Sequence, residues 1–454
     1  IEEMIGFFAD PKIAMVQATQ DFYNLDSFQH VVKPKSRFGW QQQELFFSVI
    51  QPGKDRFNAA FFCGSPGLIR RAALEEIGGI ATGTVTEDMH TSLRMQKKGW
   101  RILYYNQTLA RGLAPQTFTG FATQWQRWGQ GAMQVLRREK PFRSRELTLA
   151  QKVCYLGSFY FYWMSYVKFF FVITPVISLM LGVFVLVTDP ASYASYFLPY
   201  FVLNLASSVL LQGGFRNFLL SERFNLLKMH VLMRTLSGLF ERNAIFFVTP
   251  KARATAARAS EVLLPLTLLV LLTLSIAVGA VRIQEVEFMG YFWWALAVNL
   301  AWAVIFFTMM AGLVVRSLQH REQRSKYRFH LQNEVPMRLT FADTQGRTVD
   351  ISQYADNLSR AGVSATLDQR ITEGTPVQLE FFFPDYSVQL AGKIVRNQPF
   401  IVDGQERIAS GIQFDEVSPQ TQDEISVFLL QEVAPLQSRL LNLTHDSQAE
   451  LEIA

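Results

Sequence analysis

The chain has 454 residues, more than one domain's worth, and 49% of them are hydrophobic, with a mean hydropathy of +0.12. It is too apolar for an ordinary soluble protein, so we expect membrane segments. The net charge of +5 suits anionic lipid, nucleotide phosphates or nucleic acid alike. The distant Cys63 and Cys154 exclude a disulfide framework and a cysteine-based zinc site, and the histidines show no metal spacing.

The first residues have the pattern of a segment from the middle of an α/β domain. Residues 1–8 have helical spacing, Asp10 and Pro11 mark a turn, and Ile13–Val16 is a short apolar run typical of a buried strand. No initiator methionine and no signal-peptide pattern precede them. We therefore expect the chain to begin in the middle of a domain.

An aromatic run after residue 57 ends in a turn of small residues, after which we expect a helix. Small residues let the backbone approach a ligand closely, although any turn between a strand and a helix could have this pattern. The candidate site residues of this segment are Phe61, Phe62, Cys63, Gly64 and Ser65.

Thr86, Glu87 and Asp88 stand at the start of an expected helix over residues 89–100, and a strand is expected after it. A carboxylate in the first turn of a helix is often only a response to the helix dipole. It can also act as a general base that takes the proton of an attacking hydroxyl group. Taken alone, the pattern fits both interpretations.

Residues 121–133 predict a helix on which Gln124 and Trp128 share a face, with Arg127 close by. The indole offers a flat apolar surface to a sugar ring, the amide can bond hydroxyls, and the guanidinium can bind a diphosphate. The alternative is a surface helix with a buried tryptophan and a solvated arginine.

Four apolar runs of about 19 or more residues are long enough to cross a membrane. They are Phe169–Val187, Tyr193–Leu211, Val262–Val281 and Phe292–Val315, and an aromatic run, Val153–Val167, precedes them as an interfacial helix or the start of a tilted span. The loop between the second and third runs is rich in arginine and lysine, which places it in the cytosol. With four spans, both flanking regions are then cytosolic.

Within that loop, Phe224–Phe240 has the spacing of an interfacial helix with its cations on the opposite face. It leads to Phe246, Val248, Thr249 and Lys251, an aromatic and basic stretch. Such a stretch could close over a bound diphosphate as a lid. The alternative is a snorkelling lysine beside a membrane-anchored phenylalanine.

After Arg316 the sequence predicts a small β-barrel followed by a helix over residues 421–433. Arginines can flank an anionic ligand and stack on its bases, and a turn of small polar residues leaves the backbone open. A basic cluster touching acidic lipid is the alternative. The expected strands are 335–341, 347–352, 361–367, 375–383, 386–396 and 407–414, and the candidate ligand residues are Arg324, Arg328, Asn357, Ser359 and Gly362.

Taken together and in this order, the motifs resemble those of bacterial cellulose synthase catalytic subunits, which are processive family 2 glycosyltransferases with a C-terminal PilZ domain. The resemblance covers nearly the whole chain. It implies a multi-domain membrane protein with a partial α/β (GT-A-like) transferase domain, a helical transmembrane bundle and a PilZ β-barrel. The implied boundaries are 1–148, 149–317 with a gating loop at about 214–260, 318–435, and a tail at 436–454.

The resemblance also implies roles for the candidate residues. Asp88, with Thr86 and Glu87, belongs to the catalytic base, and Phe61–Ser65 lies with the acceptor and UDP site. Gln124, Arg127 and Trp128 hold the acceptor end and the donor diphosphate. The gating loop over UDP contains Phe246, Val248, Thr249 and Lys251, and cyclic di-GMP binds Arg324, Arg328, Asn357, Ser359 and Gly362.

The implied reaction is elongation of β-1,4-glucan from UDP-glucose, with export across the bacterial inner membrane and activation by cyclic di-GMP. Membrane lipid and a periplasmic cellulose synthase subunit are the implied partners, and nucleic acid is not one. In the family, the ligands of Mg²⁺ and the uridine-binding aspartates precede the point where this chain starts. We therefore expect no metal site in this chain, and no activity from it alone.

Two alternatives stay open. One is a synthase of another β-glucan or of an N-acetylhexosamine polymer, since the residues that read the sugar's substituents cannot be separated in this sequence. The other is a catalytically incomplete membrane receptor for cyclic di-GMP that acts by binding partners. The transferase motifs around Asp88, Trp128 and Lys251 favour an enzyme, because a receptor needs none of them.

Overall fold

The computed structural model describes most of the chain in two compact units. One contains Ile1–Val31 and Trp40–Glu322, and the other contains Val32–Gly39 and Gln323–Ala454. The described residues are 1–33, 38–185, 187, 189–240, 261–319, 327–331, 335–343, 345–402 and 405–435.

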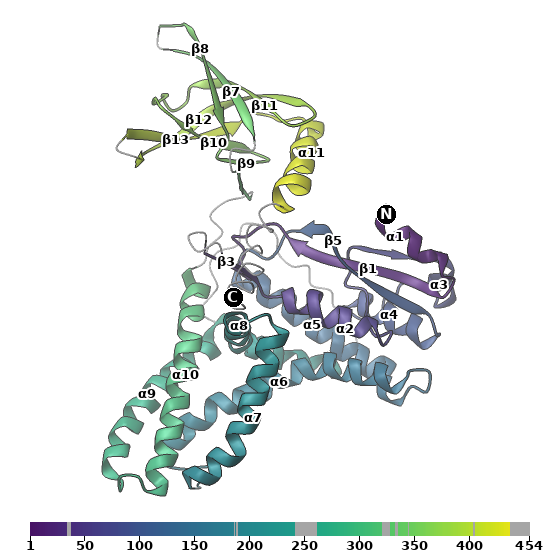
Figure 1. Ribbon diagram of the computed structural model, residues 1–454, viewed down its shortest axis with the longest axis vertical. Helices are drawn as coiled ribbons and strands as arrows, with labels where there is room; N and C mark the ends of the chain where they lie inside the picture. Colours follow the sequence, from purple (N-terminus) through teal and green to yellow (C-terminus); the bar gives the residue numbers. More distant parts are fainter. Residues whose placement is uncertain are drawn as a thin grey trace, which may run out of the picture. The chain divides into compact units, whose positions relative to one another are not determined.

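A three-stranded sheet forms the centre of the α/β part of the first unit (Figure 1). Its middle strand, β1 (Ile13–Phe22), pairs in parallel with β5 (Arg101–Gly112) and antiparallel with β4 (Gly67–Ile69). The apolar start of β1 is completely buried, as an apolar run covered on both faces should be. The predicted strand at Ile13–Val16 is therefore confirmed and is longer than expected. Strand β4 was not predicted, because the sequence favoured a helix directly after the small-residue turn.

Helices surround this sheet, and two of them carry the candidate site. Helix α4 (Glu87–Lys97) precedes β5, and α5 (Phe118–Glu139) follows it. Helix α5 begins where the hydroxyl of Thr117 accepts a hydrogen bond from the backbone N–H of Gly120, which is a typical N-cap. The remaining elements of this region are α1 (Glu2–Ile5), η1 (Gly6–Ala9), β2 (His30–Lys33), β3 (Phe38–Gln41), η3 (Phe46–Ile50), α2 (Gln51–Asp55), α3 (Arg71–Glu76) and η4 (Pro141–Arg143).

Four helices of the first unit are long and apolar enough to cross a membrane, which confirms the prediction of four spans. They are α6 (Leu149–Leu181), α7 (Pro190–Leu211), α9 (Leu263–Glu285) and α10 (Tyr291–Gln319). Of the two alternatives for Val153–Val167, an interfacial helix or the start of a tilted span, the structure agrees with the second, because α6 runs through Lys168 without a break. The ammonium of Lys168 is paired with the carboxylate of Glu222, so a charge inside the apolar run does not interrupt the helix.

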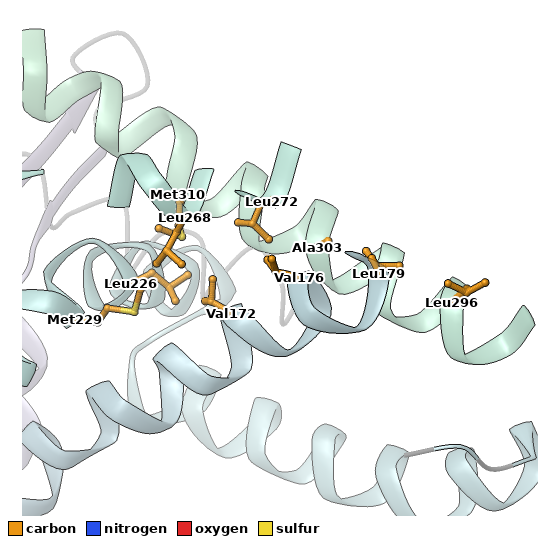
Figure 2. Packing of buried hydrophobic residues seen from close by; sticks show 10 residues of the cluster. All are labelled: Val172, Val176, Leu179, Leu226, Met229, Leu268, Leu272, Leu296, Ala303 and Met310. Carbon is orange, nitrogen blue, oxygen red and sulfur yellow. The ribbon is translucent and has the colours of Figure 1, made fainter. Parts of the chain in front are cut away.

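Helix α8 (Phe215–Arg234) joins the membrane helices through a shared core. Helices α9 and α10 lie side by side, and α6 and α8 pack against them (Figure 1). The core of this bundle consists of side chains that are less than a tenth exposed, drawn as sticks in Figure 2: Val172, Val176, Leu179, Leu226, Met229, Leu268, Leu272, Leu296, Ala303 and Met310. Between membrane helices, such a cluster stabilises the bundle through van der Waals packing, because lipid chains are as apolar as these side chains.

The prediction for α8 needs two corrections. The helix begins at Phe215 and ends at Arg234, where a short helix η5 (Thr235–Leu239) follows, instead of spanning Phe224–Phe240. The expected solvated cationic face is also wrong at Lys228, whose side chain is completely buried. Packing against neighbouring helices has overridden the amphipathic pattern there.

The second unit is an antiparallel β-domain of eight strands in the order β6-β9-β10-β13-β12-β11-β7-β8, followed by a helix. The end of β8 returns beside β10, where Gln353 Nε2 donates to the carbonyl of Thr366 at 2.7 Å. All six predicted strands are present, and the short β6 and β9 are additional. The elements are β6 (Phe329–His330), β7 (Pro336–Ala342), β8 (Thr348–Tyr354), β9 (Asn357–Ser359), β10 (Gly362–Leu367), β11 (Pro376–Phe382), β12 (Ser387–Val402), β13 (Gln405–Phe414), α11 (Pro419–Phe428) and η7 (Leu429–Val433).

Candidate active site

The segment Phe61–Ser65 is held between β1 and α4 by hydrogen bonds of its backbone. The N–H of Cys63 donates to Oε1 of Gln17 on β1 at 2.9 Å, and the N–H of Phe62 donates to Oγ of Ser92 on α4 at 2.8 Å. These bonds connect residues that are 46 and 30 positions apart in the sequence. The first predicted site segment is thereby fixed beside the helix that carries the second.

Asp88 lies in the first turn of α4, next to that segment. Its Oδ1 accepts a hydrogen bond from the N–H of Met89 at 2.7 Å, while Thr86 occupies the N-cap position without a side-chain cap bond. A Cβ on Gly64 would lie 3.6 Å from Oδ2 of Asp88, so the glycine leaves the space beside the carboxylate open. Gly64 also has a φ of +86°, which favours glycine over other residues.

The surroundings of Asp88 adjust its proton affinity. Burial of the carboxyl group raises the pKa of Asp88 to about 6, and the neighbouring Glu87 adds to this, whereas the charge of Arg127 opposes it. Glu87 itself is exposed. A carboxylate with this pKa is mostly ionised at neutral pH and can still accept a proton, as a general base must.

Helix α5 packs against α4. On α5, the ring of Trp128 stands edge-to-face against Trp125, with centroids 5.1 Å apart and an interplanar angle of 79°. Within the described part of the chain, the buried Oε1 of Gln124 and Nε1 of Trp125 have no hydrogen-bond partner. An aromatic platform next to unsatisfied polar atoms is the composition of a sugar-binding surface.

The second half of α5 is closely attached to the start of α4. The N–H of Val85 donates to Oε1 of Gln134 at 3.0 Å. A Cβ on Gly131 would lie only 2.4 Å from the side chain of Thr86, so α5 approaches the α4 N-cap as closely as a glycine allows. The sequence analysis singled out neither Gly131 nor Gln134, because their partners lie about 45 or more residues away in the sequence.

Glu139, at the end of α5, gathers three side chains of α4. Its carboxylate accepts from His90 Nε2 at 2.8 Å, from Arg94 Nε at 3.0 Å and from Lys97 Nζ at 2.9 Å. The hydrogen bond from His90, followed by those from Lys97 and Arg94, holds the pKa of Glu139 well below its usual range. Helix α5, which carries Arg127 and Trp128, is therefore bonded to α4, which carries Asp88, at both ends of α4.

The second unit brings together four of the five residues predicted to bind a nucleotide. Arg328 Nη1 lies 3.5 Å from Oδ1 of Asn357, which opens β9, and Ser359 ends that strand. Ser359 Oγ donates to the carbonyl of Gly362 at 3.0 Å, across the turn into β10. A Cβ on Gly362 would lie 2.4 Å from the carbonyl oxygen of Ile412, so only glycine fits there.

The remaining predicted residues lie outside the described part of the chain. These are Arg324 and the gating-loop residues Phe246, Val248, Thr249 and Lys251. Among the described residues, no group of three or more His, Cys, Asp or Glu side chains could hold a metal ion. The described residues alone therefore do not fit a divalent metal, and Mg²⁺ stays a prediction of the resemblance.

Two regions of the chain match known protein families. Residues 1–210, which contain Asp88 and Trp128, match Glycosyl transferase family group 2, and residues 322–431 match the PilZ domain. The chain therefore combines a region that matches glycosyltransferase family 2 with a PilZ domain and four helices that are long and apolar enough to cross a membrane.

Its curated relatives include cellulose synthase catalytic subunits described as UDP-forming. The chain is 36% identical over 245 residues to the subunit of Komagataeibacter sucrofermentans, covering 54% of this chain and 32% of the relative. It is 30% identical to cellulose synthase 1 catalytic subunit of Komagataeibacter xylinus and 29% identical to the subunit of Pseudomonas fluorescens, covering 82% of this chain and 50% of each relative. The chain thus spans half or less of the length of these relatives.

Among solved structures, the PilZ domain with c-di-GMP of YcgR from Escherichia coli is similar to part of the chain. The identity is 18%, with 28% of this chain and 98% of that chain covered and a TM-score of 0.22.

Proposed function

We propose that the protein is a processive inverting glycosyltransferase that elongates β-1,4-glucan from UDP-glucose and moves it across the membrane. The observation that carries this proposal is the open space at Gly64 beside the carboxylate of Asp88 on α4, together with the packing of α4 against α5, the helix that bears Arg127 and Trp128. A general base, an open backbone, a cation for a diphosphate and an aromatic platform are the parts that sugar transfer to a hydroxyl requires.

In the proposed reaction, the 4-hydroxyl of the terminal acceptor sugar attacks the anomeric carbon of UDP-glucose. The bond from that carbon to the diphosphate breaks as the new glycosidic bond forms, so the configuration is inverted. The hydroxyl proton passes to the carboxylate of Asp88, and Arg127 stabilises the negative charge left on UDP. Trp128 stacks against the acceptor sugar, and Gln124 bonds its hydroxyl groups.

The PilZ domain supports control of this reaction by cyclic di-GMP. Arg324 and Arg328 would bind its phosphates and stack on its guanines, while Asn357, Ser359 and Gly362 form the other side of the site. Both arginines follow the last membrane helix in the sequence, and once cyclic di-GMP binds them they are no longer available for other contacts. We infer that residues 246–251 act as a lid that such contacts keep closed, and that nucleotide binding releases it.

The proposed location is the bacterial inner membrane, with the transferase and PilZ domains in the cytosol. The supporting observation is the arginine- and lysine-rich stretch between α7 and α9, compared with the short connections at the other ends of these helices. Membrane lipid and a periplasmic subunit are proposed as partners on the resemblance alone.

The activity can be tested in membrane vesicles that contain the full-length protein, fed with radiolabelled UDP-glucose or UDP-N-acetylglucosamine. We expect label from UDP-glucose in a polymer that endo-β-1,4-glucanase degrades, and stimulation by cyclic di-GMP. Label only from UDP-N-acetylglucosamine would identify a different polymer. Binding of cyclic di-GMP without any incorporation would identify a receptor instead.

The regulatory site can be tested by isothermal titration of the full-length protein with cyclic di-GMP. We expect micromolar or tighter binding, about −8 kcal/mol or better. Arg328→Ala should weaken it by about 1.5 to 3 kcal/mol, as expected for lost charge-assisted hydrogen bonds. No saturable binding by the folded wild type would show that the β-domain only docks other proteins.

A further inference from the structure

Lys228 on α8 is a completely buried lysine with an unusual environment. Its side chain has no exposed surface, and its Nζ has no hydrogen-bond partner among the described residues. Burying an amine without hydrogen bonds is costly, and a methionine of similar length would fill the same space without that cost. The packing of the bundle therefore does not explain why a lysine occupies this position.

Aromatic rings take the place of hydrogen-bond partners around Nζ. It lies 3.6 Å from the ring centroid of Trp125 on α5 and 5.2 Å from that of Phe161 on α6. Both distances are within the range of cation–π attraction. Trp125 and Phe161 also contact each other, with centroids 5.7 Å apart. Three helices thus meet at the head group of Lys228.

The ring contact is the main interaction of Lys228, because the nearby acidic side chain is paired with another lysine. Glu222, earlier on α8, is already paired with Lys168 of α6. Burial lowers the pKa of Lys228 well below its ordinary value, while the charge of Glu222 opposes this. In the charged form the ring attracts the ammonium group, and in the neutral form the amine can still donate weakly to the ring face.

The contact continues from Trp125 to the proposed acceptor platform. Trp125 is only 9% exposed and stands edge-to-face against Trp128. Because edge-to-face pairs have a preferred geometry, the plane of one ring restricts the plane of the other. Only the ring of Trp125 therefore lies between Lys228 and Trp128, the side chain proposed to stack on the sugar.

We propose that Lys228 is a positioning residue that sets the plane of Trp125 and, through it, the plane of Trp128 for acceptor binding. This inference rests on the proposed function, since it assigns Lys228 a task in binding the polymer end. It also connects α8 to the proposed acceptor site through the ring of Trp125.

The test uses cellohexaose as a probe of the acceptor site in the full-length protein in nanodiscs, with UDP affinity measured alongside. Lys228→Met should weaken cellohexaose binding about fivefold or more, since a desolvated cation–π contact is among the stronger ones. Lys228→Arg should retain most of the affinity, because arginine also binds ring faces. Lys393→Met, at an exposed lysine of the β-domain, is the control and should bind cellohexaose like the wild type.

A double-mutant cycle separates positioning from packing. If Lys228 acts through Trp125, then Lys228→Met should add little to the loss already caused by Trp125→Leu. Additive losses, or unchanged cellohexaose binding in a folded Lys228→Met protein, would overturn the proposal. If Lys228→Met does not fold, Trp125→Phe and Trp125→Leu are compared instead. Phenylalanine keeps a weaker ring face, so Trp125→Phe should lose less cellohexaose affinity than Trp125→Leu, and equal losses of affinity would count against the inference.

A wild type that does not bind cellohexaose would refute the proposed function itself.

Discussion

The two halves of helix α5 are held by different kinds of contact. The second half is joined to α4 by directional bonds, from Gln134 to the backbone and from Glu139 to three basic side chains. The first half is surrounded by aromatic rings, and its Gln124 and Trp125 keep polar atoms without partners among the described residues. Directional bonds fix individual atomic positions, whereas edge-to-face ring contacts fix the relative orientation of the ring planes and leave more freedom in the separation of the rings.

This difference suits the proposed processive transferase. The proposed general base must keep one geometry for every transfer, which the bonded half of α5 supports by holding the start of α4. The proposed sugar platform must release each unit and receive the next, and a flat ring face allows this because it makes no directional bonds that would hold one unit in place. Four substitutions test this contrast.

Asp88→Asn should have the largest effect. Loss of a positioned general base lowers turnover by about 10²-fold or more, while UDP binding should change little. In the wild type, activity should rise as the pH increases through about 6, where Asp88 loses its proton, and the variant should lack this rise. Radiolabelled polymer synthesis across pH measures both. Polymer synthesis at the wild-type rate in the variant would end the assignment of the base.

Gly131→Ala should separate α5 from the α4 N-cap. The added Cβ would lie 2.4 Å from Thr86, and overpacking of this kind typically costs about 1 to 3 kcal/mol. Gly157→Ala on α6 is a matched control, since a Cβ there meets nothing within 4 Å. That control should be neutral or stabilising by up to about 1 kcal/mol. Thermal unfolding compares them, and equal melting temperatures would mean that the close approach is unimportant.

Glu139→Gln should weaken the bonded half by about 1.5 kcal/mol, after allowance for the partial exposure of its partners. Because the folded pKa of Glu139 is depressed, its stabilisation is complete above the unfolded pKa of about 4.3 and is lost as the pH falls below it. The acid-side decline in melting temperature should therefore be shallower in the variant. Glu75→Gln, in an exposed pair with Arg71, should show almost no change.

Trp128→Ala should have the smallest effect, about 1 kcal/mol for a lost stacking surface. It should slow polymer elongation more than it slows hydrolysis of UDP-glucose, because only elongation needs the acceptor platform. Release of UDP and incorporation of glucose, measured in the same vesicles, give the two rates. An equal reduction of both would show that Trp128 is part of the core only.

The sequence predicted those parts of the site that lie close together in the chain. The spacing of Gln124, Arg127 and Trp128 is local, and so is the place of Asp88 in a first helical turn. The role of Glu139 could not be predicted, since its three partners are 42 to 49 residues away. Their bonds form only when α4 and α5 pack.

Lysines in the membrane region misled the sequence analysis for a similar reason. Lys168 separates the apolar runs Val153–Val167 and Phe169–Val187 in the sequence, but it pairs with Glu222, 54 residues away, and α6 continues through it. Lys228 was assigned to a solvated face, but it is buried against Trp125 of another helix. The short strands β6 and β9 have too few residues for any period to be recognised.

The length of α6 has a mechanical consequence. Its 33 residues extend about 50 Å, roughly 20 Å beyond the hydrocarbon core of a bilayer. In its first turns, Tyr155 donates to Gln96 of α4, and Gln96 donates in turn to the carbonyl of Ala60, directly before the turn that borders Asp88. A bilayer of different thickness changes the tilt of such a rod. We therefore expect the rate of the proposed polymer synthesis to change with membrane thickness, because a change in the tilt of α6 would reach the turn beside Asp88 through these hydrogen bonds.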